Sequence, residues 1–96
     1  MPVEIMVFIF RLDGHKLSGR LKVLDTHDED IEQGKEYNFN IINNNEEESR
    51  SVLKFCVNGF MKASKITVLK MMGFSPANLK YTLDKFVIMS IDEIYP

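Results

Sequence analysis

The stretch KASKITVLKMMGFSPANLKYTLDKF, residues 62–86, carries the clearest local signal in the sequence. Apolar residues recur at helical spacing through its first half and predict a helix over 62–72. They are Ala63, Ile66, Leu69 and Met72. Gly73 follows where a residue in the left-handed conformation commonly ends a helix. The Ser75-Pro76 pair then suits the start of a second helix, over 76–85. The stretch therefore predicts two helices joined by a tight turn.

Four other segments are typical of strands. Residues 3–12 are apolar on both faces, which predicts a central strand covered on both sides. The turn signal Asp13-Gly14 joins this segment to a half-exposed strand over 16–25. A third strand is expected over 36–42 and a last one over 86–95, because apolar residues alternate in both.

Residues 46–60 fit either a helix or a strand. Three glutamates at 46–48 favour the start of a helix, where carboxylates oppose the helix dipole. The residues that follow have apolar side chains at both helical and alternating spacing. Asn58-Gly59 is a strong hairpin signal. Whether 46–60 is a helix or a strand, the sequence predicts a single α+β domain over residues 1–96. Its core would be an antiparallel sheet of about four strands with helices on one side.

Length and composition narrow the class of protein. Ninety-six residues with 45% hydrophobic side chains are enough for one modest core. The lone Cys56 excludes an internal disulfide and favours a reducing compartment. The apolar start at 3–10 is too short to span a bilayer and lacks the features of a signal peptide. We therefore expect a cytoplasmic protein without a membrane partner, in the host cytoplasm if it is encoded by a virus or phage.

Charge is distributed unevenly along the chain. Residues 1–48 hold five basic and eleven acidic side chains, a net charge of −6, whereas residues 49–85 hold seven basic side chains and one acidic, a net charge of +6. Asp92 and Glu93 bring the total to −2. Segregation of this kind is found at nucleic-acid surfaces, but we favour the interpretation that the two halves neutralise each other in the fold.

No catalytic, cofactor or metal motif is evident. His15 and His27 both lie in polar segments without a nucleophile beside them, and the five glycines form no phosphate loop. Cys56 lies in an apolar run, where a thiol behaves as a small hydrophobic group. An EF-hand starting at Asp28 fails at its sixth and twelfth positions. We expect no enzyme and no cofactor; a metal-dependent enzyme using His27 is the remote alternative.

The sequence LKMMGFSPANLKYTL, residues 69–83, resembles a DNA-binding helix-turn-helix. The resemblance implies a reading helix at the major groove. It implies DNA contacts from Ser75, Asn78, Lys80, Tyr81 and Lys85. Leu69 departs from the motif, which has a small residue there. Met72-Gly73-Phe74 also looks like the loop of ubiquitin-associated domains, which implies protein docking.

The acidic segment DTHDEDIE, residues 25–32, is the preferred candidate for function. Its carboxylates could occupy the basic groove of a partner. They are Asp25, Asp28, Glu29, Asp30 and Glu32. The leading hypothesis is a small non-enzymatic protein-binding regulator or inhibitor that docks on a nucleic-acid-handling complex. A transcriptional regulator of the helix-turn-helix type is the alternative. The apolar first strand is also consistent with a homodimer.

Overall fold

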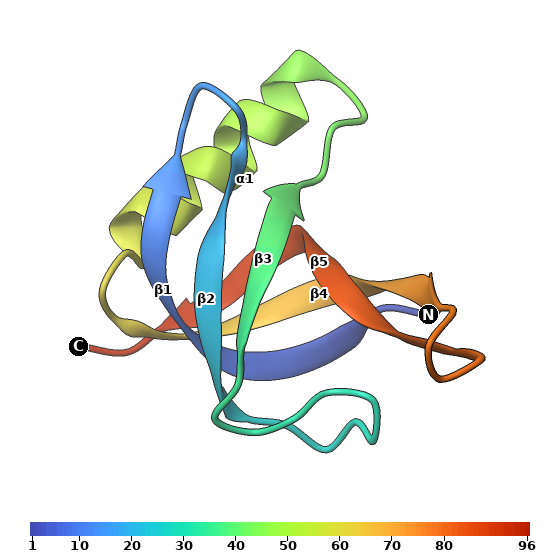
Figure 1. Ribbon diagram of the computed structural model, residues 1–96. Coiled ribbons are helices and arrows are strands. Elements are labelled where there is room, and N and C mark those ends of the chain that lie inside the picture. The colour runs from blue at the N-terminus through green and yellow to red at the C-terminus, as the bar shows by residue number, and fades with distance from the viewer.

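Five strands close into a barrel in the computed structural model, which describes residues 1–96 (Figure 1). The barrel is closed in the order β1-β2-β3-β5-β4, and β4 returns to β1. Every neighbouring pair is antiparallel except β3 and β5, which run parallel. In chain order the elements are β1 (Val3–Asp13), β2 (Ser18–Asp25), β3 (Glu36–Ile41), α1 (Glu46–Asn58), β4 (Ala63–Ser75) and β5 (Lys80–Ile94).

The predicted helix pair over 62–72 and 76–85 is wrong, because these residues form most of the hairpin of β4 and β5. Ile66 and Val68 are fully buried and alternate with partly exposed neighbours, which is the period of a strand. The chain turns at 76–79, so Gly73 lies within β4 and ends no helix. The helix-turn-helix resemblance at 69–83 is therefore excluded by the fold.

The predicted α+β class is also wrong. Strands hold 56% of the residues, and they form a closed barrel where an open antiparallel sheet was expected. The strands expected over 3–12, 16–25 and 36–42 are present with similar bounds, and the one over 86–95 is the second part of the longer β5. The parallel pairing of β3 with β5 brings the last strand beside the third, and this pairing closes the barrel.

Residues 46–58 adopt the helical alternative. The Asn45 side chain caps α1 by accepting a hydrogen bond of 2.8 Å from the backbone N–H of Glu48. Val52 and Cys56 point into the core, and Gly59 ends the helix. Figure 1 shows α1 across one end of the barrel, with the β2–β3 connection at the opposite end. With 13 residues, α1 is too short to cross a membrane.

The barrel interior is filled by one apolar cluster from all five strands and α1. Only one face of β1 is fully covered: Ile5, Val7 and Ile9 are buried, whereas the alternate residues are partly exposed. Gly19 of β2 faces the interior, where a Cβ would lie 2.6 Å from the ring of Phe39. The absence of a side chain at this position therefore allows the aromatic ring into the core.

Beyond the barrel, β4 and β5 pair only with each other and form a two-stranded arm, residues 69–84. β4 leaves β1 after Val68, and β5 joins β3 from Lys85 onward. The arm projects beside the β2–β3 connection, residues 26–35, which is called the acidic loop below (Figure 1). The buried side chain of Ile31 anchors this loop to the core.

Candidate functional site

A row of polar side chains crosses the outer surface of four neighbouring strands. Arg11 of β1 pairs with Arg20 of β2, Arg20 pairs with Asn38 of β3, and Asn38 pairs with Lys85 of β5. Directly paired residues share a face of a sheet, and the inward face is taken by core residues such as Leu21. These four side chains, called the cationic row below, therefore lie together on the outside of the barrel.

A second row lies beside the first. In this row, Lys22 of β2 pairs with Phe8 of β1 on one side and with Glu36 of β3 on the other. Lys22 and Glu36 are exposed and Phe8 is partly buried. The two rows together contain four cations and one carboxylate, a net charge of +3. A polar surface that combines unpaired cations with an aromatic ring is suited to binding an anionic polymer.

Hydrogen bonds orient the central arginine of this surface. The Nη1 atom of Arg20 donates to Oδ1 of Asn38 at 2.8 Å, and Nε lies 3.4 Å from Oε1 of Glu36. The guanidinium is therefore held by β3, with 31% of its side chain exposed. Arg11, Lys22 and Lys85 form no ion pair. Their charges are available to a ligand.

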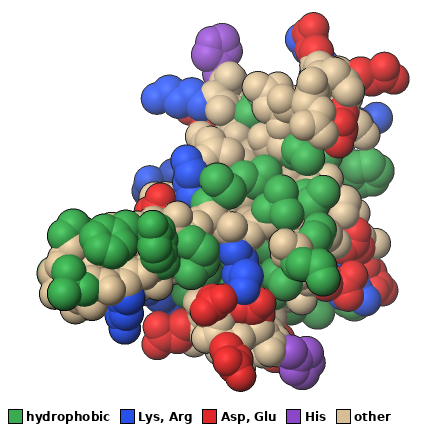
Figure 2. Space-filling model, turned by 90° about the vertical axis from the view of Figure 1, so that its right-hand side faces the viewer, with side chains coloured by type: hydrophobic (Ala, Val, Ile, Leu, Met, Phe, Trp, Pro, Cys, Tyr) green, Lys and Arg blue, Asp and Glu red, His purple; other side chains and the backbone are tan.

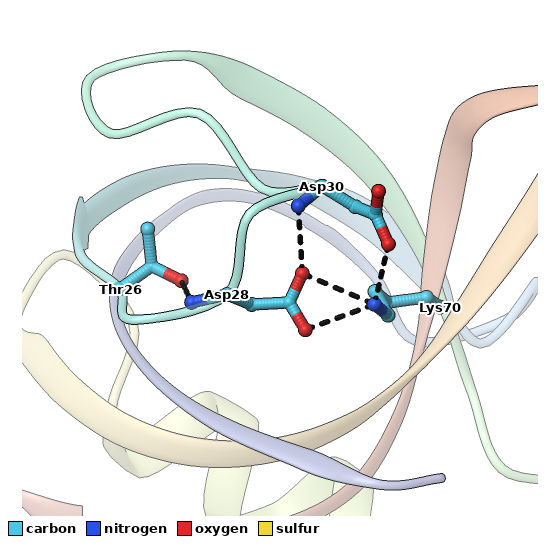
Figure 3. A network of polar contacts seen from close by, with 4 residues as sticks. All are labelled: Thr26, Asp28, Asp30 and Lys70. Atoms are coloured by element: carbon cyan, nitrogen blue, oxygen red, sulfur yellow. Dashed lines mark hydrogen bonds and ion pairs between the residues drawn. The ribbon is translucent and has the colours of Figure 1, made fainter.

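The acidic loop is tied to the arm by Lys70 (Figure 3). The Nζ atom of Lys70 donates to both carboxylate oxygens of Asp28, at 2.9 and 3.0 Å, and to Oδ2 of Asp30 at 2.7 Å. The Asp28 carboxylate also accepts the backbone N–H of Asp30, and the N–H of Asp28 donates to the hydroxyl of Thr26. These contacts fix the first half of the loop.

The electrostatics of this cluster favour its charged form. Burial raises the pKa of Asp28, but hydrogen bonds from Lys70 and the Asp30 backbone outweigh burial, so the pKa lies below its usual value. Hydrogen bonds to Asp30 and Asp28 raise the pKa of Lys70. Both partners stay ionised near neutral pH, and the cluster acts as a structural contact.

The residues expected to bind a protein partner are thereby divided into two sets. Asp28 and Asp30 hold Lys70, and only 16% of the Asp28 side chain is exposed. Asp25, Glu29 and Glu32 are exposed and form no ion pair. The free acidic surface is therefore smaller than the sequence suggests, although three carboxylates remain available.

The residues expected to bind DNA are also separated. Four of them lie at the tip of the arm, at the end of β4, in the turn and at the start of β5: Ser75, Asn78, Lys80 and Tyr81. Lys85 lies at the base of the arm and belongs to the cationic row. No helix presents any of these side chains, so the expected groove-reading arrangement is wrong.

Sequence reasoning missed Arg11, Arg20 and Lys22. The alternation of Arg20 and Lys22 with apolar neighbours does predict that both point outward from a strand. Their alignment with Arg11 and Lys85 depends on the strand register and on the parallel pairing of β3 with β5. Neither is encoded in a local pattern.

The cysteine and the two histidines lie on three different parts of the fold. Cys56 is fully buried in the core, and burial raises the pKa of its thiol to about 12. His15 lies in the β1–β2 turn and His27 in the acidic loop, and both are exposed. No group of three or more histidine, cysteine, aspartate and glutamate side chains is arranged to hold a metal ion.

Comparisons with known proteins identify no relative of the chain. No family model matches the chain, and no curated protein or solved structure matches it at a significant level.

Proposed function

We propose that the chain binds single-stranded nucleic acid across the outer face of β1, β2, β3 and β5. The observation that carries the proposal is the cationic row, with Arg11, Arg20 and Lys85 aligned across four strands. Neighbouring strands lie about 4.8 Å apart, so the row spans roughly 14 Å. Cations over this length follow a phosphate backbone better than they fit one isolated phosphate.

Aromatic side chains beside the cations support a single strand as the ligand. Phe8 belongs to the neighbouring row, and Phe10 lies next to Arg11 on β1, where the register shifts. Both rings are partly exposed. Unpaired bases stack on such rings, whereas the bases of a duplex are already stacked on each other.

The connectivity of the barrel gives a second line of support. A five-stranded barrel ordered β1-β2-β3-β5-β4, with its helix between β3 and β4, has the connectivity of the OB fold. Barrels of this kind bind oligonucleotides on strands 2 and 3, between the β1–β2 and β4–β5 loops. One fold hosts many functions, so this likeness supports the proposal only together with the side chains.

A salt titration with a fluorescent oligothymidine tests the proposal. Binding is expected at low salt, and log Kd should rise by about 0.7 per log unit of salt for each phosphate neutralised. Lys22→Gln should weaken binding and reduce this slope. Lys54→Gln removes the same charge from exposed α1 and should change neither. Absence of binding at low salt, or equal effects of the two variants, would refute the proposal.

The second candidate function is protein binding through the acidic loop. The observation in its favour is that Glu29 and Glu32 are exposed and unpaired beside the arm. Such carboxylates suit the basic surface of a nucleic-acid-handling complex. The test reverses Glu29 and Glu32 to lysine and leaves Asp28 and Asp30 in place, because these two hold Lys70. Unchanged capture of a protein partner from nuclease-treated lysate would exclude this candidate.

A further inference from the structure

A small hydrogen-bonded network lies at the centre of the proposed binding face. The Arg20 guanidinium bridges two residues of β3, because Nη1 donates to Oδ1 of Asn38 at 2.8 Å and Nε lies 3.4 Å from Oε1 of Glu36. A guanidinium can only donate hydrogen bonds, so the Asn38 atom that faces it must be the amide oxygen. The amide nitrogen of Asn38 is therefore directed away from Arg20.

Three polar atoms of this network are used by neither contact. They are Nδ2 of Asn38, Nη2 of Arg20 and Oε2 of Glu36, called the polar array below. Asn38 and Glu36 are exposed, and Arg20 is partly exposed. The two nitrogens can only donate hydrogen bonds, and a carboxylate oxygen can only accept them. Because the guanidinium bridges the other two side chains, the order along the array is acceptor, donor, donor.

The carboxylate of Glu36 decides which part of a nucleic acid can lie over the array. Its paired neighbour on β2 is Lys22, which forms no ion pair and attracts a phosphate. A phosphate beside Glu36 would instead meet a like charge. The edge of a base is uncharged, and its amino groups are the donors that a carboxylate accepts. Phosphates should therefore follow the cations, and a base edge should lie at Glu36.

The order of the array matches one base better than the others. Along its Watson–Crick edge, cytosine presents the amino donor N4 and then the acceptors N3 and O2, so Glu36, Arg20 and Asn38 can each pair with one atom. Thymine and uracil place a carbonyl oxygen against the carboxylate and an N–H against the guanidinium. Guanine also places an N–H against the guanidinium, and adenine leaves one donor of the array unpaired. Unpaired or opposed polar groups weaken binding.

We propose that Glu36, Arg20 and Asn38 select cytosine over thymine and uracil in the strand that the cationic row binds. The inference rests on the proposed function and adds a base preference to it. Glu36 accepts the amino group of cytosine, and Arg20 and Asn38 donate to its ring nitrogen and its carbonyl oxygen. Contacts between cations and phosphates position a strand but carry no sequence information, so the preference depends on the polar array.

The other surfaces that offer contacts to bases supply no such preference. Phe8 and Phe10 lie beside the cations on β1, and Figure 2 shows the arm as a protruding lobe with a cluster of hydrophobic side chains. Aromatic and apolar groups hold the flat face of every base, so their contribution is tolerant of sequence. Discrimination between two pyrimidines of the same size therefore requires the hydrogen-bonding atoms of the array.

Competition between oligocytidine and oligothymidine of equal length, near neutral pH, tests the inference. The two strands carry the same number of phosphates and of pyrimidine rings, so they differ in the edge that the array would read. Oligocytidine should bind at least about fivefold more tightly. Glu36→Gln should bring this ratio to one or below, because Arg20 would hold the new amide oxygen and leave an amide N–H facing the base. The same variant should bind oligothymidine more tightly than wild type, because it removes a charge that repels phosphates.

Lys22→Gln is the matched control, because Lys22 is the paired neighbour of Glu36 on the same face. It should weaken the binding of both strands by the same factor and leave the ratio unchanged. If Glu36 only held Arg20 in place, Glu36→Gln would also leave the ratio unchanged. That result, or equal binding of the two strands by wild type, would overturn the inference and leave the proposed function in place. Absence of binding to either strand would overturn both.

Discussion

Lys70 and Asp28 are 42 residues apart in the sequence and meet through two hydrogen bonds of 2.9 and 3.0 Å. The contact joins the base of the arm to the acidic loop, two segments that share no strand pairing. Each side chain is mostly buried, at 20% and 16% exposure. Lys70 therefore holds the first half of the loop against the arm, in addition to the anchor that the buried Ile31 provides.

Replacing Asp28 should lower stability in a manner that depends on pH. Its pKa is lower in the folded chain, so its contribution is present above the ordinary value of 3.8 and is lost as pH falls through the folded value. The pKa of Lys70 is raised, so its contribution is lost only as pH rises above 10.5. Asp28→Asn should cost about 1–2 kcal/mol near pH 7 and much less near pH 2.

Urea unfolding at both pH values measures this difference. Asp25→Asn is the control, because Asp25 is exposed and has no ion pair. Equal losses for the two variants, or a loss for Asp28→Asn that does not change with pH, would contradict the assignment.

Gly19→Ala should disrupt the barrel. An added Cβ would lie 2.6 and 2.8 Å from two ring carbons of Phe39 and closer still to the carbonyl oxygen of Arg11. Neither neighbour can withdraw freely, because one is a fully buried ring and the other is backbone. We expect a loss of roughly 3 kcal/mol or more in thermal or urea unfolding.

Gly14→Ala provides the matched control for this substitution. A Cβ at Gly14 would meet only Leu53, at an ordinary contact distance of 3.5 Å. This variant should unfold close to wild type. Comparable losses at positions 14 and 19 would show that the close approach of Phe39 is not the cause.

The Cys56 thiol should resist alkylation in the folded protein. Burial raises its pKa from 9.0 to about 12, so the reactive thiolate is scarce at about pH 8. Iodoacetamide should leave the native chain unmodified and add one group after denaturation in urea, as measured by intact mass. Rapid modification under native conditions would contradict the buried placement of Cys56.

Asn45→Ala should destabilise α1 through the loss of its cap. The side chain accepts the backbone N–H of Glu48 at 2.8 Å, and removal of such a cap costs about 1 kcal/mol. Asn45→Ser retains an acceptor and should retain most of the stability. Thermal unfolding followed by circular dichroism compares the two variants, and equal losses would argue against capping as the cause.

The sequence predicts elements well where one period dominates. Residues 16–25 alternate cleanly and form β2, and the glutamates at 46–48 correctly indicate the start of α1. The sequence predicts a helix over 62–72 because Ala63, Ile66 and Leu69 are also spaced as on a helix. The alternation of Ser64, Ile66 and Val68 was present in the same residues, and tertiary burial decided between the two periods.

The functional surfaces were less predictable, because they depend on long-range pairing. The charge of Asp28 is visible in the sequence, but its partner Lys70 lies on a strand that was expected to be a helix. The alternation of Arg20 with apolar residues predicts an outward side chain, but Lys85 lies 65 positions away and reaches the same row, beyond Asn38, only through the parallel strand pair. Local patterns contain no information on such partners.

The parallel pairing of β3 with β5 also constrains how the chain can fold during its synthesis. β5 lies between β3 and β4, so a nascent chain that ends before Lys85 leaves both neighbours with an open edge. Open edges recruit other strands, and these edges persist until β5 has left the ribosome. The barrel therefore cannot close by stages during synthesis, and the fifteen residues of β5 decide whether the earlier strands form a folded domain or an aggregate.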